Sequence, residues 1–287
     1  DINNKKQTVY IPSLGTTAKD KDSDIQIAKA GKITIIDTVD YKNVLPGKEL
    51  TLYGELYNRR TGEVLKDADG KVISNTKVFT PASANGSEKM EFTFDASLLA
   101  GETIVAFETL RRNNIDIATH TDINSDAQSI WIPKITTTLR EGETGSKNVL
   151  YTNDVYLIDT VNYENLPDGE YIMRGELWNK DTNKAVTIDG KTVTGEKKFK
   201  VENGSLKGSV NVEYHFDATK TDLIKEDGSM SPTVCFEEVI AAVNIAEQGH
   251  NETVTIPAYD EEVTEIRYIC NDCGKSFETV EEFDAHK

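Results

Sequence analysis

The chain has 287 residues, of which 32 are Lys or Arg and 49 are Asp or Glu, so its formal net charge is −17. An acidic surface of this size disfavours nucleic acid and anionic membranes as partners, because both attract basic faces. With 37% hydrophobic residues, the composition is typical of a globular protein long enough for about two domains. No apolar run approaches the roughly 20 residues of a membrane span, and no signal peptide is recognisable.

The first twelve residues return later in the sequence. Residues 1–12 end in Val-Tyr-Ile-Pro and match residues 122–133, which end in Ile-Trp-Ile-Pro. We interpret 1–12 as the last strand of a preceding repeat, and a chain that starts at Asp1 without Met as a fragment of a longer array. The polar, non-periodic segment 13–30 is predicted to be a linker.

A large repeat fills most of the remaining chain. The run Ile-Asp-Thr-Val-Asp-Tyr that begins at Ile36 recurs as Ile-Asp-Thr-Val-Asn-Tyr from Ile158, an offset that suits whole domains rather than a solenoid. We expect one domain at 31–134, a polar linker at 135–149 and a second domain at 150–258. Three later segments recur in the same order, namely 54–56 as 175–177, 94–95 as 216–217, and 105–108 as 234–237.

Both copies are predicted to be all-β. Short β-branched runs such as 32–35 and 253–256 are separated by turn signals such as Asn85-Gly86 and Asp189-Gly190. Several short strands within about 100 residues favour an immunoglobulin-like β-sandwich. The predicted fold is therefore a tandem pair of such sandwiches, followed by a small ββα tail.

The repeated segments resemble a known family. An Asp-Thr-Val-x-Tyr strand at 37–41, the Val-Ala-Phe-Glu strand at 105–108 and a final hairpin with His and Gln are similar to the VaFE repeats of Gram-positive surface proteins, which are adhesin- or pilin-like. The resemblance covers 31–134 closely and 150–258 with departures. It implies an extracellular domain of the cell surface or cell wall.

In that family a Thr and a Gln side chain join as an internal ester. Matched residue by residue, the resemblance implies Thr38 as the nucleophile, Gln128 as the acyl donor, and Glu108 and His120 as the assisting groups. A Thr hydroxyl needs a base to take its proton, and a His of ordinary pKa suits that role. A buried Glu with a raised pKa can stay protonated, so Glu108 could donate a hydrogen bond to the Gln carbonyl or shuttle the proton.

The second copy departs from this pattern. Thr160 and Glu237 are retained, but counting along the shortened hairpin puts Gln248 at the place of His120 and Glu252 at the place of Gln128. A carboxylate is a far worse acyl donor than an amide, so we expect this copy to lack the ester. A slipped hairpin that uses Gln248 remains the alternative. In the family, an acidic residue follows the Gly-x-Leu strand, which here is the segment 54–56. This chain has Asn58 at that place, so the identity of the acid that assists Glu108 stays open.

The tail, 264–287, has different chemistry. Cys270 and Cys273 are separated by two residues, and twelve residues separate Cys273 from His286. This spacing resembles a two-Cys, two-His zinc finger that lacks its second His, so we expect weak zinc binding by Cys270, Cys273 and His286. The alternative is a stray Cys pair on an acidic tail. No cofactor is expected in the two sandwiches, because no other Cys or His cluster of the sequence has metal-ligand spacing. Acidic residues in the expected helix argue against DNA as its partner.

These observations predict a structural stalk segment of a surface protein, not an enzyme that turns over a substrate. Its expected partners are neighbouring repeats of the same longer protein. The competing function is a binding module whose loops recognise a host protein or glycan. Aromatic residues fall mostly in the strand segments rather than in loops, which favours the stalk.

Overall fold

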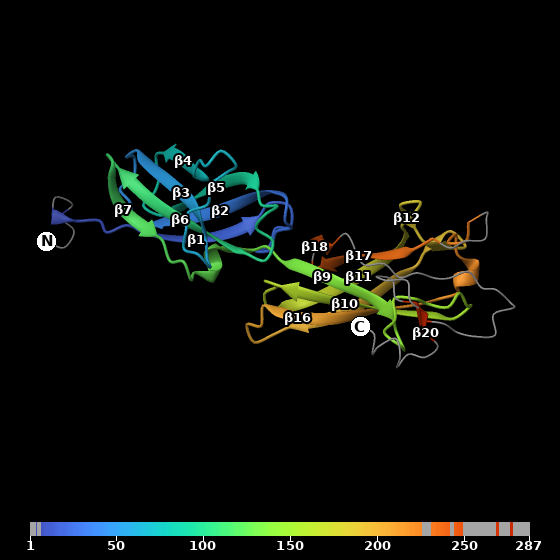
Figure 1. Cartoon of the computed structure of the whole chain (residues 1–287). Helices are drawn as coiled ribbons and strands as arrows, with labels where there is room; N and C mark the ends of the chain where they lie inside the picture. The colour runs from blue at the N-terminus through green and yellow to red at the C-terminus, as the bar shows by residue number, and fades with distance from the viewer. Residues whose placement is uncertain are drawn as a thin grey trace. The chain divides into compact units, whose positions relative to one another are not determined.

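The computed structural model describes residues 4, 7–225, 231–241, 244–248, 268–269 and 276–277 of the chain. These residues form strands, turns and short 3₁₀ turns without any α-helix, which confirms the all-β prediction (Figure 1). The described residues up to Lys134, with Glu164–Pro167, make up unit 1, and the rest make up unit 2. Across this described part, no helix has the length and apolarity to cross a membrane.

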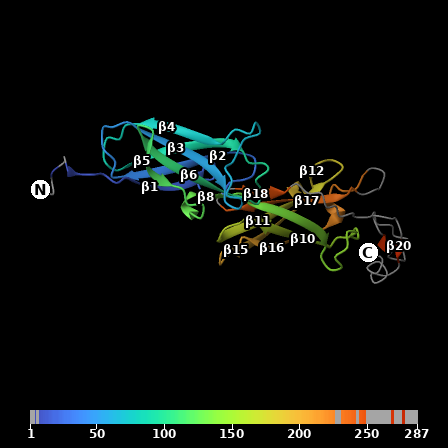
Figure 2. The same cartoon turned by 60° about the vertical axis from the view of Figure 1, so that its left-hand side comes forward.

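Unit 1 consists of two antiparallel sheets, which can be followed in two views (Figure 1, Figure 2). The first sheet has the strand order β1-β2-β5, and the second has the order β4-β3-β6-β7 with β8 paired to β6. The strands are β1 (Ser13–Asp20), β2 (Lys32–Lys42), β3 (Leu50–Asn58), β4 (Ser74–Phe79), β5 (Gly86–Asp95), β6 (Thr103–Arg112), β7 (Ile115–His120) and β8 (Ser129–Trp131).

The core of unit 1 lies between these sheets, because alternate residues of each strand are buried. Ile35 and Phe92 enter it from the first sheet, and Leu52 and Ile104 from the second. On β2 the inward positions are apolar except for one, Asp37, whose side chain is fully buried. A buried carboxylate is costly in an apolar core, so Asp37 marks a site that needs an explanation.

Unit 2 repeats this arrangement. One sheet has the order β16-β10-β9, and the other has the order β12-β11-β17-β18 with β15 paired to β11. On β10 the inward positions are again apolar except for Asp159. The strands are β9 (Lys134–Glu141), β10 (Val155–Glu164), β11 (Gly169–Asn179), β12 (Lys184–Ala185), β13 (Thr187–Ile188), β14 (Lys191–Thr192), β15 (Thr194–Val201), β16 (Lys207–Phe216), β17 (Thr233–Ile240) and β18 (Asn244–Gln248).

Both predicted linkers are wrong in their first halves. Segment 13–30 contains β1, which pairs with β2 along its whole length, and segment 135–149 contains most of β9, which pairs with β10. Both strands are polar on their outer face, and the apolar alternation is only partial, so composition alone made them resemble linkers. The first sandwich therefore begins at Ser13 instead of residue 31, and the second at Lys134 instead of residue 150, each directly after an Ile-Pro pair.

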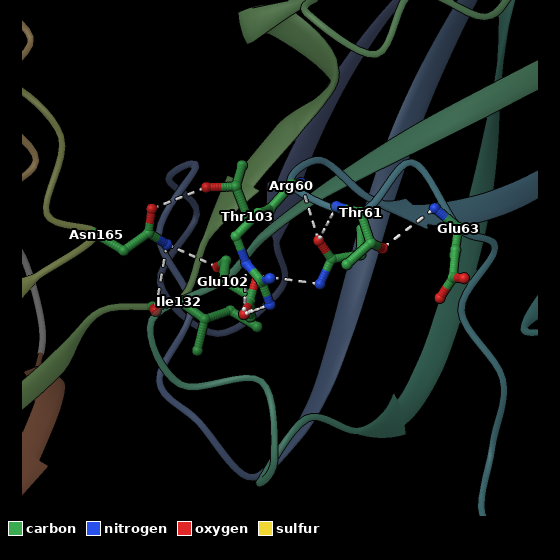
Figure 3. Close-up of polar contacts among 8 residues, drawn as sticks. Arg60, Thr61, Glu63, Glu102, Thr103, Ile132 and Asn165 are labelled. Carbon is green, nitrogen blue, oxygen red and sulfur yellow. Dashed lines mark hydrogen bonds and ion pairs between the residues drawn. The ribbon is translucent and has the colours of Figure 1, made fainter.

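The end of unit 1 is closed by a polar network (Figure 3). The Asn165 amide donates to the carbonyls of Glu102 at 2.6 Å and Ile132 at 3.3 Å, and it accepts a hydrogen bond from Thr103 at 2.9 Å. The carboxylate of Glu102 in turn receives Arg60 and Asn58. Asn58, which stands where an acid was expected, also accepts a hydrogen bond from the backbone N–H of Arg60 and so stabilises this turn. Its equivalent Asn179 stabilises a turn in the same way, because its side chain accepts hydrogen bonds from two backbone N–H groups.

Candidate functional site

Five polar side chains of unit 1 meet inside the sandwich. They come from strands far apart in the sequence: Thr16 from β1, Asp37 from β2, Glu108 from β6, His120 from the end of β7, and Gln128 from the 3₁₀ turn η2 (Asp126–Gln128). Asp37, Glu108 and Gln128 are fully buried. Buried polar groups at this density are rare without a chemical role.

Gln128 is held by its amide nitrogen. Nε2 donates to the carboxyl oxygen Oε2 of Glu108 at 2.8 Å, to the Ala106 carbonyl at 2.6 Å and to the His120 carbonyl at 3.2 Å. The amide oxygen Oε1 has no hydrogen-bond partner although it is buried. The nitrogen of the amide is therefore fixed beside an acid, and its carbonyl is left without the solvation that water would give.

Thr16 is placed between a base and the acid. Its hydroxyl Oγ1 lies 3.2 Å from Nδ1 of His120, and the Thr16 side chain also lies next to Glu108. Partial burial lowers the pKa of His120, so the imidazole is neutral at neutral pH and able to accept a proton. This is the arrangement of a hydroxyl nucleophile beside a general base.

Asp37 and Glu108 form a buried acid pair. Burial raises the pKa of Glu108 well above its usual value, and the charge of Asp37 raises it further. Burial also raises the pKa of Asp37, to about 6. Two ionised carboxylates at this distance repel each other and have no proton with which to form a hydrogen bond. The buried pair is therefore stable only when the two groups share a proton. Glu108 therefore carries a proton that it can donate to the neighbouring amide.

A glycine opposite Glu108 makes room for an aromatic ring of the facing sheet. Gly54 of β3 stands opposite Glu108 of β6, and a Cβ on Gly54 would lie 2.7 Å from the ring atom Cζ of Phe92. In unit 2 Gly175 stands opposite Glu237 in the same way. The repeated Gly-x-Leu motif thus has a packing reason, because an aromatic ring from the facing sheet occupies the space of the missing side chain.

The structure brings Glu108, His120 and Gln128 together, as the resemblance implied, but not Thr38. Thr38 follows Asp37 on β2, and successive side chains of a strand point to opposite faces, so Thr38 lies on the outer face while Asp37 points inward. Its equivalent in the second copy, Thr160, also lies on the outer face, where it donates to Asn211 at 2.9 Å. The hydroxyl at the site belongs to Thr16.

Sequence reasoning missed Thr16 and Asp37, although the repeat carries a signal for both. Thr16 stands four residues after Pro12, and Thr137 stands four residues after Pro133, so this Thr recurs with the strand that begins each sandwich. Asp37 recurs as Asp159 within the same Asp-Thr-Val motif that drew attention to Thr38. In both copies, the residue of the Asp-Thr-Val motif that points into the sandwich is the Asp, not the Thr.

Unit 2 keeps the acid pair and the hydroxyl. Asp159 and Glu237 are buried, and burial, reinforced by Asp159, raises the pKa of Glu237 to about 10. Thr137 of β9 lies next to Glu237, as Thr16 lies next to Glu108. In the strand register Gln248 stands opposite Glu237, whereas His120 stands opposite Glu108. The register confirms that Gln248 takes the place of His120, so the imidazole base is missing at this position of unit 2.

The tail is described only at two short strands, β19 (Tyr268–Ile269) and β20 (Ser276–Phe277), which pair antiparallel. Cys270, Cys273 and His286 lie outside the described residues, as does Glu252, and the zinc site stays a prediction.

Comparison with known proteins gives a family match and distant structural similarities. No curated protein matches the chain significantly. Among solved structures, a bacterial adhesin from Mobiluncus mulieris containing intramolecular disulfide, isopeptide and ester bond cross-links is 13% identical, with a TM-score of 0.37, over 79% of this chain and 80% of that chain. A glycosyl hydrolase family 2 member from Bacteroides cellulosilyticus is 11% identical, with a TM-score of 0.32, over 87% of this chain and 31% of that chain. Neither similarity supports a functional argument.

The family match is of a different kind, because it spans most of the chain. The model of the T-Q ester bond containing domain matches twice, over residues 12–132 and 133–265. Each match begins just before the strand that carries the repeated Thr, β1 in one case and β9 in the other. The chain therefore belongs to the family of T-Q ester bond containing domains and carries two copies of that domain.

Proposed function

We propose that unit 1 forms an intramolecular ester between the Thr16 hydroxyl and the Gln128 carboxamide. The observation that carries this proposal is the placement of the fully buried Gln128 amide against Glu108, with the Thr16 hydroxyl at hydrogen-bond distance from His120 and next to Glu108. Nucleophile, base, acid and acyl group are all supplied by the folded chain, so no second molecule is required.

The reaction proceeds by addition and elimination. His120 Nδ1 takes the Thr16 hydroxyl proton as Oγ1 attacks the carbonyl carbon Cδ of Gln128, which forms the new C–O bond. Glu108 donates its proton to the amide nitrogen, the C–N bond breaks, and ammonia leaves. The proton held by His120 then restores the acid pair. One ester and one ammonia replace one hydroxyl and one amide, and the site does not turn over.

The position of the bond suits a stalk under tension. It would join β1, the first strand of the sandwich, to the turn that leads into β8, the last strand. Force applied at the two ends of such a domain is transmitted by the bond instead of by the hydrogen bonds between strands. We therefore infer a structural role as a stalk segment of a bacterial cell-surface, adhesin-like protein, with neighbouring repeats as its partners.

Intact mass tests the ester directly. Purified chain should be lighter than its sequence mass by one ammonia, because unit 1 has the full set of groups and unit 2 lacks the His at the base position. A mass equal to that of the sequence would overturn the ester. A deficit of two ammonias would instead mean that unit 2 reacts as well, with Gln248 as the candidate donor; peptide mapping would locate each bond.

The acid pair predicts a pH dependence of stability in the uncross-linked domain. In a Thr16→Val variant, Asp37 and Glu108 keep raised pKa values in the folded state, so the folded state binds more protons than the unfolded state above about pH 4. The free energy of unfolding should therefore fall as the pH rises from about 4 through the Asp37 pKa of about 6 and beyond. Urea denaturation across this range measures the slope, and adding Asp37→Asn should flatten it. A stability that rises with pH over the same range would contradict the shared proton.

A further inference from the structure

Unit 2 holds a second set of buried polar groups beside its acid pair. Asp159, Cys235 and Glu237 each direct one ligand atom into a space where these atoms all lie within 4.8 Å of one another. All three side chains are buried, and neither carboxylate has a hydrogen-bond donor in the geometry of the fold. The three come from both sheets of the sandwich, with Asp159 on β10 and the other two on β17.

A fourth group points into the same space. The hydroxyl of Tyr214, on β16, belongs to a side chain that is only 1% exposed, and it has no hydrogen-bond partner. It occupies the gap left by Gly175: a Cβ on that glycine would lie 1.9 Å from the Tyr214 hydroxyl and 3.5 Å from Cγ of Glu237. The phenol therefore ends beside the Glu237 side chain, and it also lies near the Cys235 thiol. An orphaned phenol in a sealed core costs free energy unless something binds it.

These added groups are specific to unit 2. At the equivalent repeat positions unit 1 has Ala106 in place of Cys235 and Phe92 in place of Tyr214, and neither residue offers a ligand atom. The second copy thus gains a thiol and a phenol on two different strands, both directed at the acid pair. In the same copy the position of His120 is taken by Gln248.

We propose that Asp159, Cys235 and Glu237, completed by the Tyr214 phenol, bind a zinc ion that joins the two sheets of unit 2. One thiolate with two carboxylates is a mixed donor set of the kind that zinc accepts, and four ligands complete its tetrahedral shell. The ion would supply the partner that the unpaired carboxylate oxygens and the phenol lack. A metal cross-link would then stand in unit 2 where an ester stands in unit 1.

Cobalt reports on this site because a thiolate bound to Co²⁺ gives an intense charge-transfer absorption. The test uses the whole chain with Cys270→Ser and Cys273→Ser, so that Cys235 is its only cysteine. Refolding this variant with Co²⁺ should produce the absorption, and adding Zn²⁺ should remove it. Adding Cys235→Ala, which installs the residue found in unit 1, should abolish the band while the chain still folds. A chain refolded with Co²⁺ that shows no thiolate band would overturn the proposal.

The phenol is tested by Tyr214→Phe, again the residue of unit 1. This change keeps the ring and should weaken Zn²⁺ binding by more than about tenfold. Zn²⁺ should also raise the unfolding temperature of unit 2 in the double Cys→Ser variant and leave it unchanged after Cys235→Ala. An equal rise in both variants would place the zinc elsewhere and contradict the assignment. The ammonia deficit of unit 1 should be the same in all of these variants, so failure of the metal site is distinguishable from failure of the ester.

Discussion

Thr16→Val is expected to restore one ammonia to the intact mass and to remove the cross-link of unit 1. Val has nearly the shape of Thr, so the variant loses the hydroxyl but keeps the packing of β1. By analogy with a disulfide, closing a loop of roughly 100 residues contributes about 4.7 kcal/mol to stability. Loss of the bond should therefore lower the unfolding temperature of unit 1 by on the order of 20 °C.

Three matched variants make this expectation sharp. Gln128→Ala should restore the same mass from the acyl side, whereas Thr16→Ser keeps a hydroxyl and should still lose ammonia. Thr38→Ala changes the neighbouring strand on its outer face and should keep the cross-link. If Thr38→Ala restored the full mass while Thr16→Val did not, the assignment of the nucleophile to Thr16 would be wrong.

The exchange of Thr38 for Thr16 illustrates what the sequence could and could not predict. The repeat predicted the two sandwiches, and the family resemblance placed Glu108 and His120 in patterned strands and Gln128 in the final hairpin segment. The repeated sequence did not reveal which face of β2 is buried, because Asp37 and Thr38 are adjacent and both recur in the second copy. A charged residue is ordinarily assigned to the outer face, and the site reverses that rule.

The position of β1 was hidden for a related reason. Its inward residues include Thr16 and Asp20, so the strand lacks the apolar alternation that marks a half-buried strand. A functional hydroxyl on the core face weakens the very pattern by which the strand would be recognised. The same holds for β9, where Thr137 occupies the equivalent position. Alignment of the repeats from the Ile-Pro pair onward, instead of from the Asp-Thr-Val motif, recovers both strands.

Comparison of the two copies separates the scaffold from the chemistry. Both retain the inward Asp, the Glu opposite a Gly, and the Thr of the first strand, which together form one sealed acid pair. They differ in the groups around that pair: His120 with Gln128 in unit 1, and Cys235 with Tyr214 in unit 2. The acid pair alone destabilises the core, and the two proposals give each copy a use for it, proton donation in unit 1 and metal ligation in unit 2.

Glu108→Gln is expected to give a folded unit 1 that forms the ester at least about 100-fold more slowly than the unchanged chain. The substitution keeps the shape of the side chain and a hydrogen bond to the Gln128 amide, but it removes the proton that the leaving nitrogen needs. Asp37→Asn should also slow the reaction, because the charge of Asp37 helps to keep Glu108 protonated. His120→Ala should fold and react slowly, since Thr16 then loses its proton acceptor.

The fraction of chain that has lost ammonia, followed by intact mass from the moment of purification, measures these rates. Asp40→Asn is the matched control, because Asp40 lies on the same strand as Asp37 but is exposed, and it should react at the normal rate. Circular dichroism must show a folded sandwich in each variant. If His120→Ala or Glu108→Gln completed the ester as fast as Asp40→Asn does, that residue would not take part in proton transfer. Slow reaction by both, with folding intact, is what a Thr16 nucleophile between a neutral imidazole and a protonated carboxyl requires.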